Sequence, residues 1–174
     1  MINKQDIKKA RKGDHEAFIR LITEIKLPMY RMARTLLNTD EDCGDAIQET
    51  VLKAYKALHS LQQPDYFQTW IFRILINECN RILGNQHKQG EADEIKRITY
   101  IEPGYENIDL RELVNDLDEP LRIVVILHYF HDMTMKQISN ILDLTEGAVK
   151  TRMYRARKQL LEWLSNSERK EHEA

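Results

Sequence analysis

Apolar residues recur at steps of three and four along most of the chain, the spacing that places them on one face of an α-helix. In the first half this pattern predicts a short basic helix over 6–12 and a long helix over 17–37 that Pro28 either kinks or restarts. A second long helix is expected to open at Asp45 and to end near Leu58. After a loop rich in glutamine, a third is expected over about 67–83.

The periodicity fades between Gly84 and about Asn107, where glycine, proline and charged residues are interspersed. We predict a flexible linker there, because a structureless segment of this length is uncommon inside one compact domain. Beyond it, helices are expected over 110–117, 121–130, 135–142 and about 146–164. The pattern therefore predicts an all-α fold of two small helical domains. Their expected bounds are 1–87 and 108–168, with the linker over 88–107 and a tail over 169–174.

Composition agrees with this interpretation, since the 174 residues include only 6 glycines and 4 prolines. A net charge of −2 argues against a uniformly basic nucleic-acid-binding protein. The charge is unevenly distributed, however. Acidic residues outnumber basic ones over 91–119, whereas residues 146–160 contain several basic residues and the single acid Glu146. A local basic patch of this kind indicates a protein that meets DNA at one surface and another partner elsewhere.

The two cysteines, Cys43 and Cys79, lie far apart in the sequence and indicate neither a disulfide framework nor a metal knuckle. No signal peptide is visible at the start of the sequence, and no apolar run is long enough to span a membrane. We therefore expect a cytoplasmic protein without a metal site.

The most specific local pattern is a predicted helix-turn-helix over 134–154. Thr134 and Gln137 have the spacing of a capping box at the start of its first helix. A short turn follows at Asp143 and Leu144, and Thr145 can cap the second helix. Two helices joined by about three residues, the second rich in cations, are typical of this DNA-binding unit.

A helical wheel divides the second helix of this unit into two faces. Val149, Met153, Ala156 and Leu160 lie on the side expected to pack on the core. In a major groove, the residues expected near base edges are Lys150, Thr151, Tyr154 and Arg155. Thr145 at the helix start is a further candidate for contact with the −35 element. Arg152, Arg157 and Lys158 are better placed for phosphates.

Two segments of the first half resemble region 2 of the sigma-70 family of RNA polymerase sigma factors: DAIQETVLKAYKAL over 45–58 and FQTWIFRILIN over 67–77. The order of the parts and the short length are similar to the extracytoplasmic-function (ECF) group, which keeps only region 2 and region 4. The resemblance implies region 2 over 1–87 and region 4 over 108–168. It also implies promoter-specific transcription initiation in response to envelope or other stress, with no catalytic residue and no cofactor.

The resemblance further implies the partners. The polymerase largest-subunit clamp would be bound through Asp45, Gln48, Glu49 and Lys53, which share one face of a helix. Region 4 would bind the flap of the second-largest subunit and the −35 element of promoter DNA. The linker would run toward the RNA exit path. An anti-sigma factor would act as the inhibitor and could hold the cytoplasmic protein at the membrane.

The −10 element would be recognised by the loop over 60–66 and the helix after it, because aromatic residues near a loop suit the capture of unstacked bases. The candidate contacts are Phe67, Thr69, Trp70, Arg73, Asn77, Asn80 and Arg81. Trp70 either packs in the core or stacks on a base, and the same two roles are open to Phe67. Glu78 on this helix weakens the case for the individual contacts.

Two other classes of protein fit the sequence less well. A metal enzyme could use His128 and His131, but no cysteine or carboxylate ligand follows at helical spacing, so a helix-terminal or surface role is favoured for this pair. A dimeric regulator would join a sensing domain to the helix-turn-helix, and it would not need the segments 45–58 and 67–77.

Overall fold

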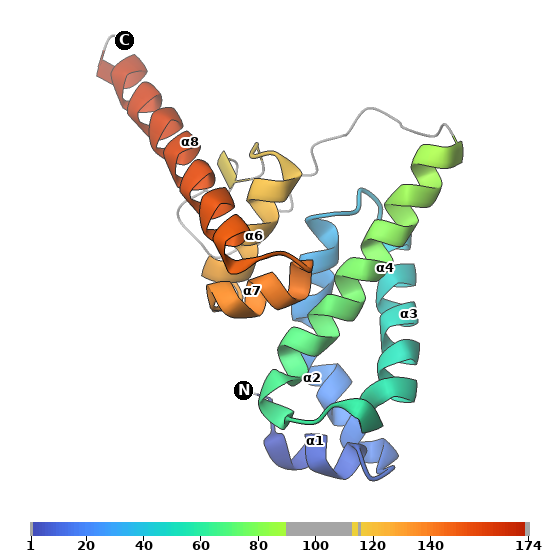
Figure 1. Cartoon of the computed structure of the whole chain (residues 1–174). Coiled ribbons are helices and arrows are strands. Elements are labelled where there is room, and N and C mark those ends of the chain that lie inside the picture. Colours follow the sequence, from blue (N-terminus) through green and yellow to red (C-terminus); the bar gives the residue numbers. More distant parts are fainter. Residues whose placement is uncertain (1, 90–112, 115, 173–174) are drawn as a thin grey trace. The chain divides into compact units, whose positions relative to one another are not determined.

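A computed structural model describes residues 2–89, 113–114 and 116–172 of the protein. The regular structure of these residues is helical (Figure 1). These described residues include no strand, so the predicted all-α class is confirmed. Contacts divide the chain into two compact units, each with its own buried apolar core. The predicted linker lies almost entirely outside the described residues.

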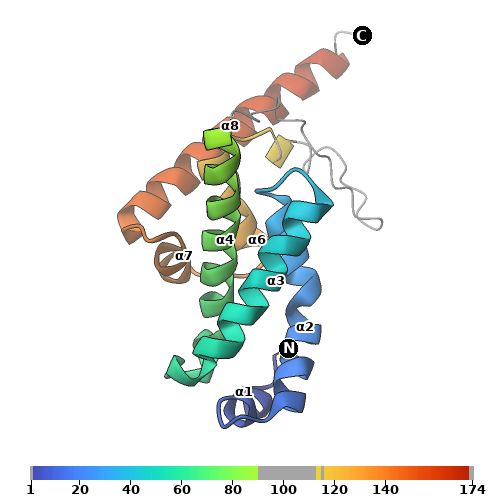
Figure 2. The same cartoon turned by 90° about the vertical axis from the view of Figure 1, so that its right-hand side faces the viewer.

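The first unit is built on three long helices, α2 (His15–Arg34), α3 (Asp40–Ala57) and α4 (Phe67–Gln89), and a short helix, α1 (Lys4–Ala10), packs across the end of α2 (Figures 1 and 2). Two short 3-10 helices join α3 to α4: η1 (Leu58–Ser60) and η2 (Pro64–Tyr66). α3 packs against both α2 and α4. Fully buried side chains from these helices form the core, among them Leu21, Ile25, Met29, Ala46, Ala54, Ile71 and Leu75.

The predicted start of α3 at Asp45 is wrong by five residues, because the helix begins at Asp40. Thr39 is its N-cap, and the Thr39 hydroxyl oxygen accepts a hydrogen bond from the Asp42 backbone N–H at 3.0 Å. Acidic residues fill the first turn, where they interact favourably with the helix dipole. α2 ends at Arg34 with Thr35 as its C-cap, three residues before the predicted end at Leu37, so the Asn38-Thr39-Asp40 sequence starts α3 but does not end α2.

Pro28 lies inside α2, which continues through it. A proline inside a helix costs about 3 kcal/mol, but Met29, Met32 and Ala33 beyond it are completely buried, and their burial offsets that cost.

Helix α4 runs further than the expected end near Leu83, to Gln89. Within this extension the Gln86 side-chain amide donates a hydrogen bond to Asp42 at 3.1 Å, which ties the end of α4 to the first turn of α3.

The second unit contains α6 (Glu119–Tyr129), α7 (Met135–Leu142) as far as Ser139, and α8 (Glu146–His172), and α6 packs along α8. Of the helix expected over 110–117, residues 113 and 114 are helical, and the other described residues form a turn. α8 continues beyond the expected end near Leu164, because the segment that follows is rich in helix-forming residues and free of glycine and proline. The core of the second unit includes Val124, Leu127, Ile138, Val149, Met153 and Ala156.

Candidate nucleic-acid interface

Helices α7 and α8 form the predicted helix-turn-helix, and local hydrogen bonds define its corners. The capping box is confirmed: the Gln137 N–H donates to the Thr134 hydroxyl at 3.2 Å, and the Thr134 N–H donates to the Gln137 side chain at 2.9 Å. Asp143 ends α7 in the left-handed conformation with φ +56°, and the Leu144 N–H returns to the Ser139 carbonyl at 3.0 Å. Thr145 caps α8 by accepting from the Ala148 N–H at 3.2 Å.

The two faces of α8 separate as the helical wheel predicts. Val149, Met153 and Ala156 are buried, whereas Leu160 is only half-buried. The opposite side is exposed, and Tyr154 on it has an exposed fraction of 70%. The exposed residues here are Thr145, Lys150, Thr151, Tyr154, Arg155, Arg157 and Lys158, and Arg152 is half-buried. An exposed cationic face opposite an anchored apolar face is what a groove-binding helix requires.

Two cations of this face have partners within the unit. Lys150 Nζ lies 2.8 Å from Glu146 one turn earlier, and this hydrogen bond lowers the pKa of the Glu146 carboxyl. Arg157 donates from Nε to the Tyr129 hydroxyl on α6 at 3.0 Å. The sequence pattern did not indicate Tyr129, because its contact with α8 depends on how α6 and α8 pack.

The predicted polymerase-binding residues lie on the outer side of α3. Asp45, Gln48 and Lys53 are exposed, and Glu49 is half-buried. Lys53 forms a hydrogen bond with Glu78 of α4.

The candidate −10 residues on α4 fall into two groups. Arg73, Asn77, Asn80 and Arg81 are exposed at three- and four-residue steps and share one face. Trp70 is half-buried, with its ring 6.0 Å from that of Phe67. Phe67 and Thr69, with exposures of 1% and 7%, are core residues. In this conformation their side chains cannot contact DNA, because the first turn of α4 packs inward.

The loop before α4 exposes its polar and aromatic side chains. Leu61 is buried and anchors the segment, whereas Gln62, Gln63 and Tyr66 are exposed. Asp65 also reaches solvent and forms an ion pair with Lys4 of α1 at 2.5 Å.

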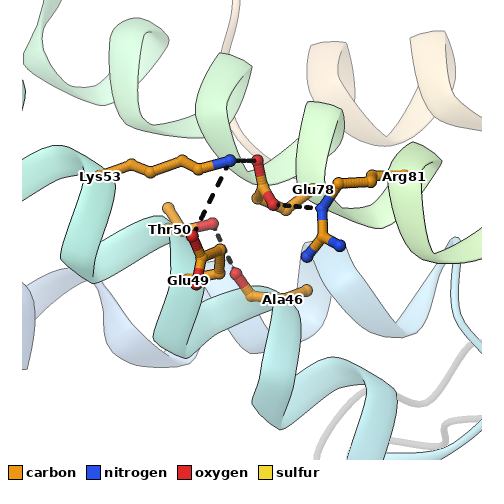
Figure 3. Close-up of polar contacts among 6 residues, drawn as sticks. All are labelled: Ala46, Glu49, Thr50, Lys53, Glu78 and Arg81. Atoms are coloured by element: carbon orange, nitrogen blue, oxygen red, sulfur yellow. Dashed lines mark hydrogen bonds and ion pairs between the residues drawn. The ribbon is translucent and has the colours of Figure 1, made fainter.

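Glu78, which the sequence indicated only as an acid among the candidate −10 contacts, lies buried between α3 and α4. It is only 4% exposed, and its two oxygens accept hydrogen bonds from Lys53 Nζ at 2.5 Å and Arg81 Nε at 2.9 Å (Figure 3). Burial acts to raise the pKa of Glu78, but the hydrogen bonds from Lys53 and Arg81 outweigh it, so that the pKa lies below its ordinary value. The spacing of Glu78 and Arg81 could have suggested their pair, but nothing local indicated Lys53.

The remaining polar candidates have structural roles. His128 Nδ1 lies 2.8 Å from the Met133 carbonyl at the end of α6, which gives it a helix-terminal role. Among the described residues, no group of His, Cys, Asp and Glu side chains is arranged to hold a metal ion.

Cys43 and Cys79 are free, and burial raises their pKa values to about 11 and about 12, so both thiols are protonated at neutral pH. No helix in the described part of the chain has the length and hydropathy needed to cross a membrane.

Comparison with protein families explains why these two units occur in one chain. The family model for sigma-70 region 2 matches residues 21–89, and the model for sigma-70 region 4 matches residues 108–160. The chain belongs to the sigma-70 family. The region 2 match contains the Asp45–Lys53 surface and all of α4, and the region 4 match contains the helix-turn-helix.

Curated relatives place this sigma-70 protein in the ECF group. It is 29% identical over 141 residues to the RNA polymerase sigma factor SigV of Bacillus subtilis (strain 168), covering 79% of this chain and 84% of the relative. It is 27% identical over 169 residues to the ECF RNA polymerase sigma-E factor of Escherichia coli (strain K12), covering 87% and 88%.

Two solved structures share the fold. CnrH, in complex with the cytosolic domain of CnrY, has a TM-score of 0.68 at 22% identity and covers 95% of this chain and 99% of its own. The sigma factor RpoE from Bartonella quintana, in complex with the anti-sigma factor NepR, has a TM-score of 0.67 at 22% identity and covers 85% and 96%.

Proposed function

We propose that this sigma-70 protein binds core RNA polymerase and directs it to promoters through −10 and −35 elements. The observation that carries this proposal is that one chain combines a region 2 bundle and a region 4 helix-turn-helix whose second helix has an exposed cationic face. We propose no catalytic role for the chain itself, because the polymerase supplies the chemistry. The domain bounds that we propose remain 1–87 and 108–168.

Region 4 recognises the −35 element by inserting α8 into the major groove. Thr151, Tyr154 and Arg155 lie opposite the buried face of α8 and Lys150 lies on its flank, and from these positions their side chains can reach base edges. Arg152 and Arg157 on the flanks, and Lys158 further along the exposed face, contact phosphates, and Thr145 at the helix start approaches the DNA backbone. Base contacts supply specificity, whereas phosphate contacts supply register and salt-dependent affinity.

Region 2 docks on the polymerase clamp through Asp45, Gln48, Glu49 and Lys53. The loop over 60–66 captures an unstacked base of the −10 strand, and Arg73, Asn77, Asn80 and Arg81 hold the strand along α4. Trp70 can contribute one edge of its ring because it is half-buried. Phe67 and Thr69 take no part in these contacts, since both are buried.

We further propose an anti-sigma factor as the regulatory partner, released under envelope or other stress. Support comes from two proteins of the same fold, CnrH and RpoE, which were solved as complexes with CnrY and the anti-sigma factor NepR. Such an inhibitor would compete with polymerase for the exposed surfaces of both units.

In vitro transcription tests the proposal directly. The purified chain is added to core polymerase freed of other sigma factors, on templates chosen by sequencing the 5′ ends of transcripts induced when the chain is overproduced. We expect initiation at defined start sites that share −10 and −35 sequences. Failure to associate with core polymerase, or initiation no different from that of core alone, would refute it. A variant with Arg155→Ala and Lys150→Ala should still bind the polymerase but lose promoter selection, which separates the two activities.

A further inference from the structure

The carboxylate of Glu78 is buried between α3 and α4, whereas both of its cationic partners reach solvent. The Glu78 side chain is 5% exposed, against 46% for Lys53 and 53% for Arg81. A buried carboxylate is costly unless its oxygens are hydrogen-bonded, and here each oxygen has one cationic donor (Figure 3). The arrangement therefore holds one nitrogen of each cation, Lys53 Nζ and Arg81 Nε, against Glu78, while the rest of each side chain reaches the surface.

Each cation keeps donors free for an outside partner. The Lys53 ammonium group has three N–H donors, of which Glu78 takes one, and Glu49 lies 3.9 Å away on the same helix. Arg81 uses Nε for Glu78, and Figure 3 shows its two terminal nitrogens pointing away from the carboxylate. Lys53 belongs to the surface assigned above to the polymerase, and Arg81 to the surface assigned to the −10 strand.

We propose that Glu78 is a positioning residue shared by these two surfaces. Its buried carboxylate orients Lys53 toward polymerase and also orients Arg81 toward the promoter strand. This inference rests on the proposed function. The three residues come from two helices and lie 25 and 3 positions apart in sequence, so α3–α4 packing creates the link.

The link predicts an effect across the two surfaces. When Lys53 is removed, one oxygen of Glu78 loses its donor, and the remaining cation, Arg81, can satisfy both oxygens with its forked guanidinium. Arg81 is thereby drawn inward, away from the DNA strand. Loss of Arg81 draws Lys53 inward in the same way and weakens polymerase docking.

The test measures DNA binding by holoenzyme at saturating polymerase, so that docking affinity does not enter. The probe is fork-junction DNA whose single strand carries the −10 sequence found for the wild-type chain. We expect Lys53→Met to weaken fork binding about three- to tenfold, as for the loss of one charged contact. Lys53→Arg, which keeps a cation beside Glu78, should restore most of the affinity. Lys56→Met, at an exposed lysine of the same helix, should match wild type.

The decisive comparison repeats Lys53→Met in a Glu78→Gln background, where there is no buried charge to recruit Arg81. Fork affinity should then be the same with and without Lys53. The inference is overturned if Lys53→Met leaves fork affinity at the wild-type value, or weakens it equally in both backgrounds. Should Glu78→Gln fail to fold, Arg81→Met replaces it, and Lys53→Met must then have no further effect. If wild type does not bind polymerase at all, the proposed function fails first, and that result is distinguishable because it precedes any comparison of variants.

Discussion

Arg157 of α8 donates a hydrogen bond from Nε to the hydroxyl of Tyr129 at the end of α6, across 3.0 Å and 28 positions of sequence. The guanidinium carbon also lies 5.8 Å from the centre of the Tyr129 ring, near the outer limit of a cation–π contact. The hydrogen bond is therefore the stronger restraint. It holds the arginine at the edge of the recognition helix with its terminal nitrogens available for a phosphate.

Arg157→Gln should weaken binding to −35 DNA by a similar factor for every sequence tested. Because one phosphate contact is lost, the slope of log affinity against log salt should fall by about 0.9. Tyr129→Phe removes only the hydroxyl and should give a smaller loss in the same direction. Fluorescence anisotropy over a salt series measures both quantities. Lys26→Gln, at an exposed lysine of α2, is the control. An effect of Arg157→Gln confined to one sequence would contradict the assignment to phosphate.

Arg155→Ala should behave differently, because Arg155 lies on the outermost face of α8. We expect a loss of about 1–3 kcal/mol on the preferred −35 sequence and much less on sequences changed at one particular base pair. Binding measured against a panel of single-base variants would locate that base pair. A uniform loss across the panel would instead assign Arg155 to the backbone.

Thr134→Ala should destabilise the second unit by about 1 kcal/mol, because it removes the cap of α7 and half of the capping box. Urea unfolding followed by circular dichroism measures the change. Thr23→Ala is the matched control: its hydroxyl donates to the Ile19 carbonyl within α2 and caps nothing, so little change is expected. Equal effects of the two substitutions would argue against the capping role.

Asp132→Gly should stabilise the protein by up to about 1 kcal/mol, since the exposed Asp132 has φ +52°, a left-handed conformation that costs a side-chain-bearing residue about this much. Asp132→Ala keeps the strain and should bring no gain. Thermal unfolding of the two variants side by side gives the answer. A gain from alanine as large as that from glycine would show that strain is not the cause.

Stability should fall in acid partly through Glu78. Its folded pKa lies below the ordinary value of 4.5, so its contribution is complete above that value and is lost as pH falls through the folded pKa. At neutral pH, Glu78→Gln should cost about 1–2 kcal/mol, limited by the solvent access of both cations. Urea midpoints measured from neutral pH to below 4.5 should converge for wild type and Glu78→Gln. A constant difference over that series would exclude the charge of Glu78 as its source.

Local patterns were predictable where the contacts are local. The Thr134–Gln137 capping box spans three positions, and the buried face of α8 repeats every turn, so both follow from spacing alone. Helix ends were less predictable, as α2 and α3 show: α2 ends at Arg34 and α3 begins at Asp40 behind its cap Thr39, and the pattern of apolar residues indicates neither boundary.

Which aromatic and charged side chains are buried could be decided only from the tertiary structure. Phe67 is an aromatic residue at the edge of a loop, as expected of a residue that stacks on a base, yet it is 1% exposed because the start of α4 packs inward. Glu78 was a charged residue on an amphipathic helix and could have faced water. It is buried because Lys53, on a different helix, supplies the donor that makes its burial tolerable.

The sequence by itself determined the all-α class, the helix-turn-helix and the cationic face of α8, because helical periodicity, caps and turns act over a few neighbouring residues. Only the tertiary structure decided which polar residues are linked: Glu78 to Lys53, and Tyr129 to Arg157. These pairs lie 25 and 28 positions apart, and the packing of whole helices brings them together.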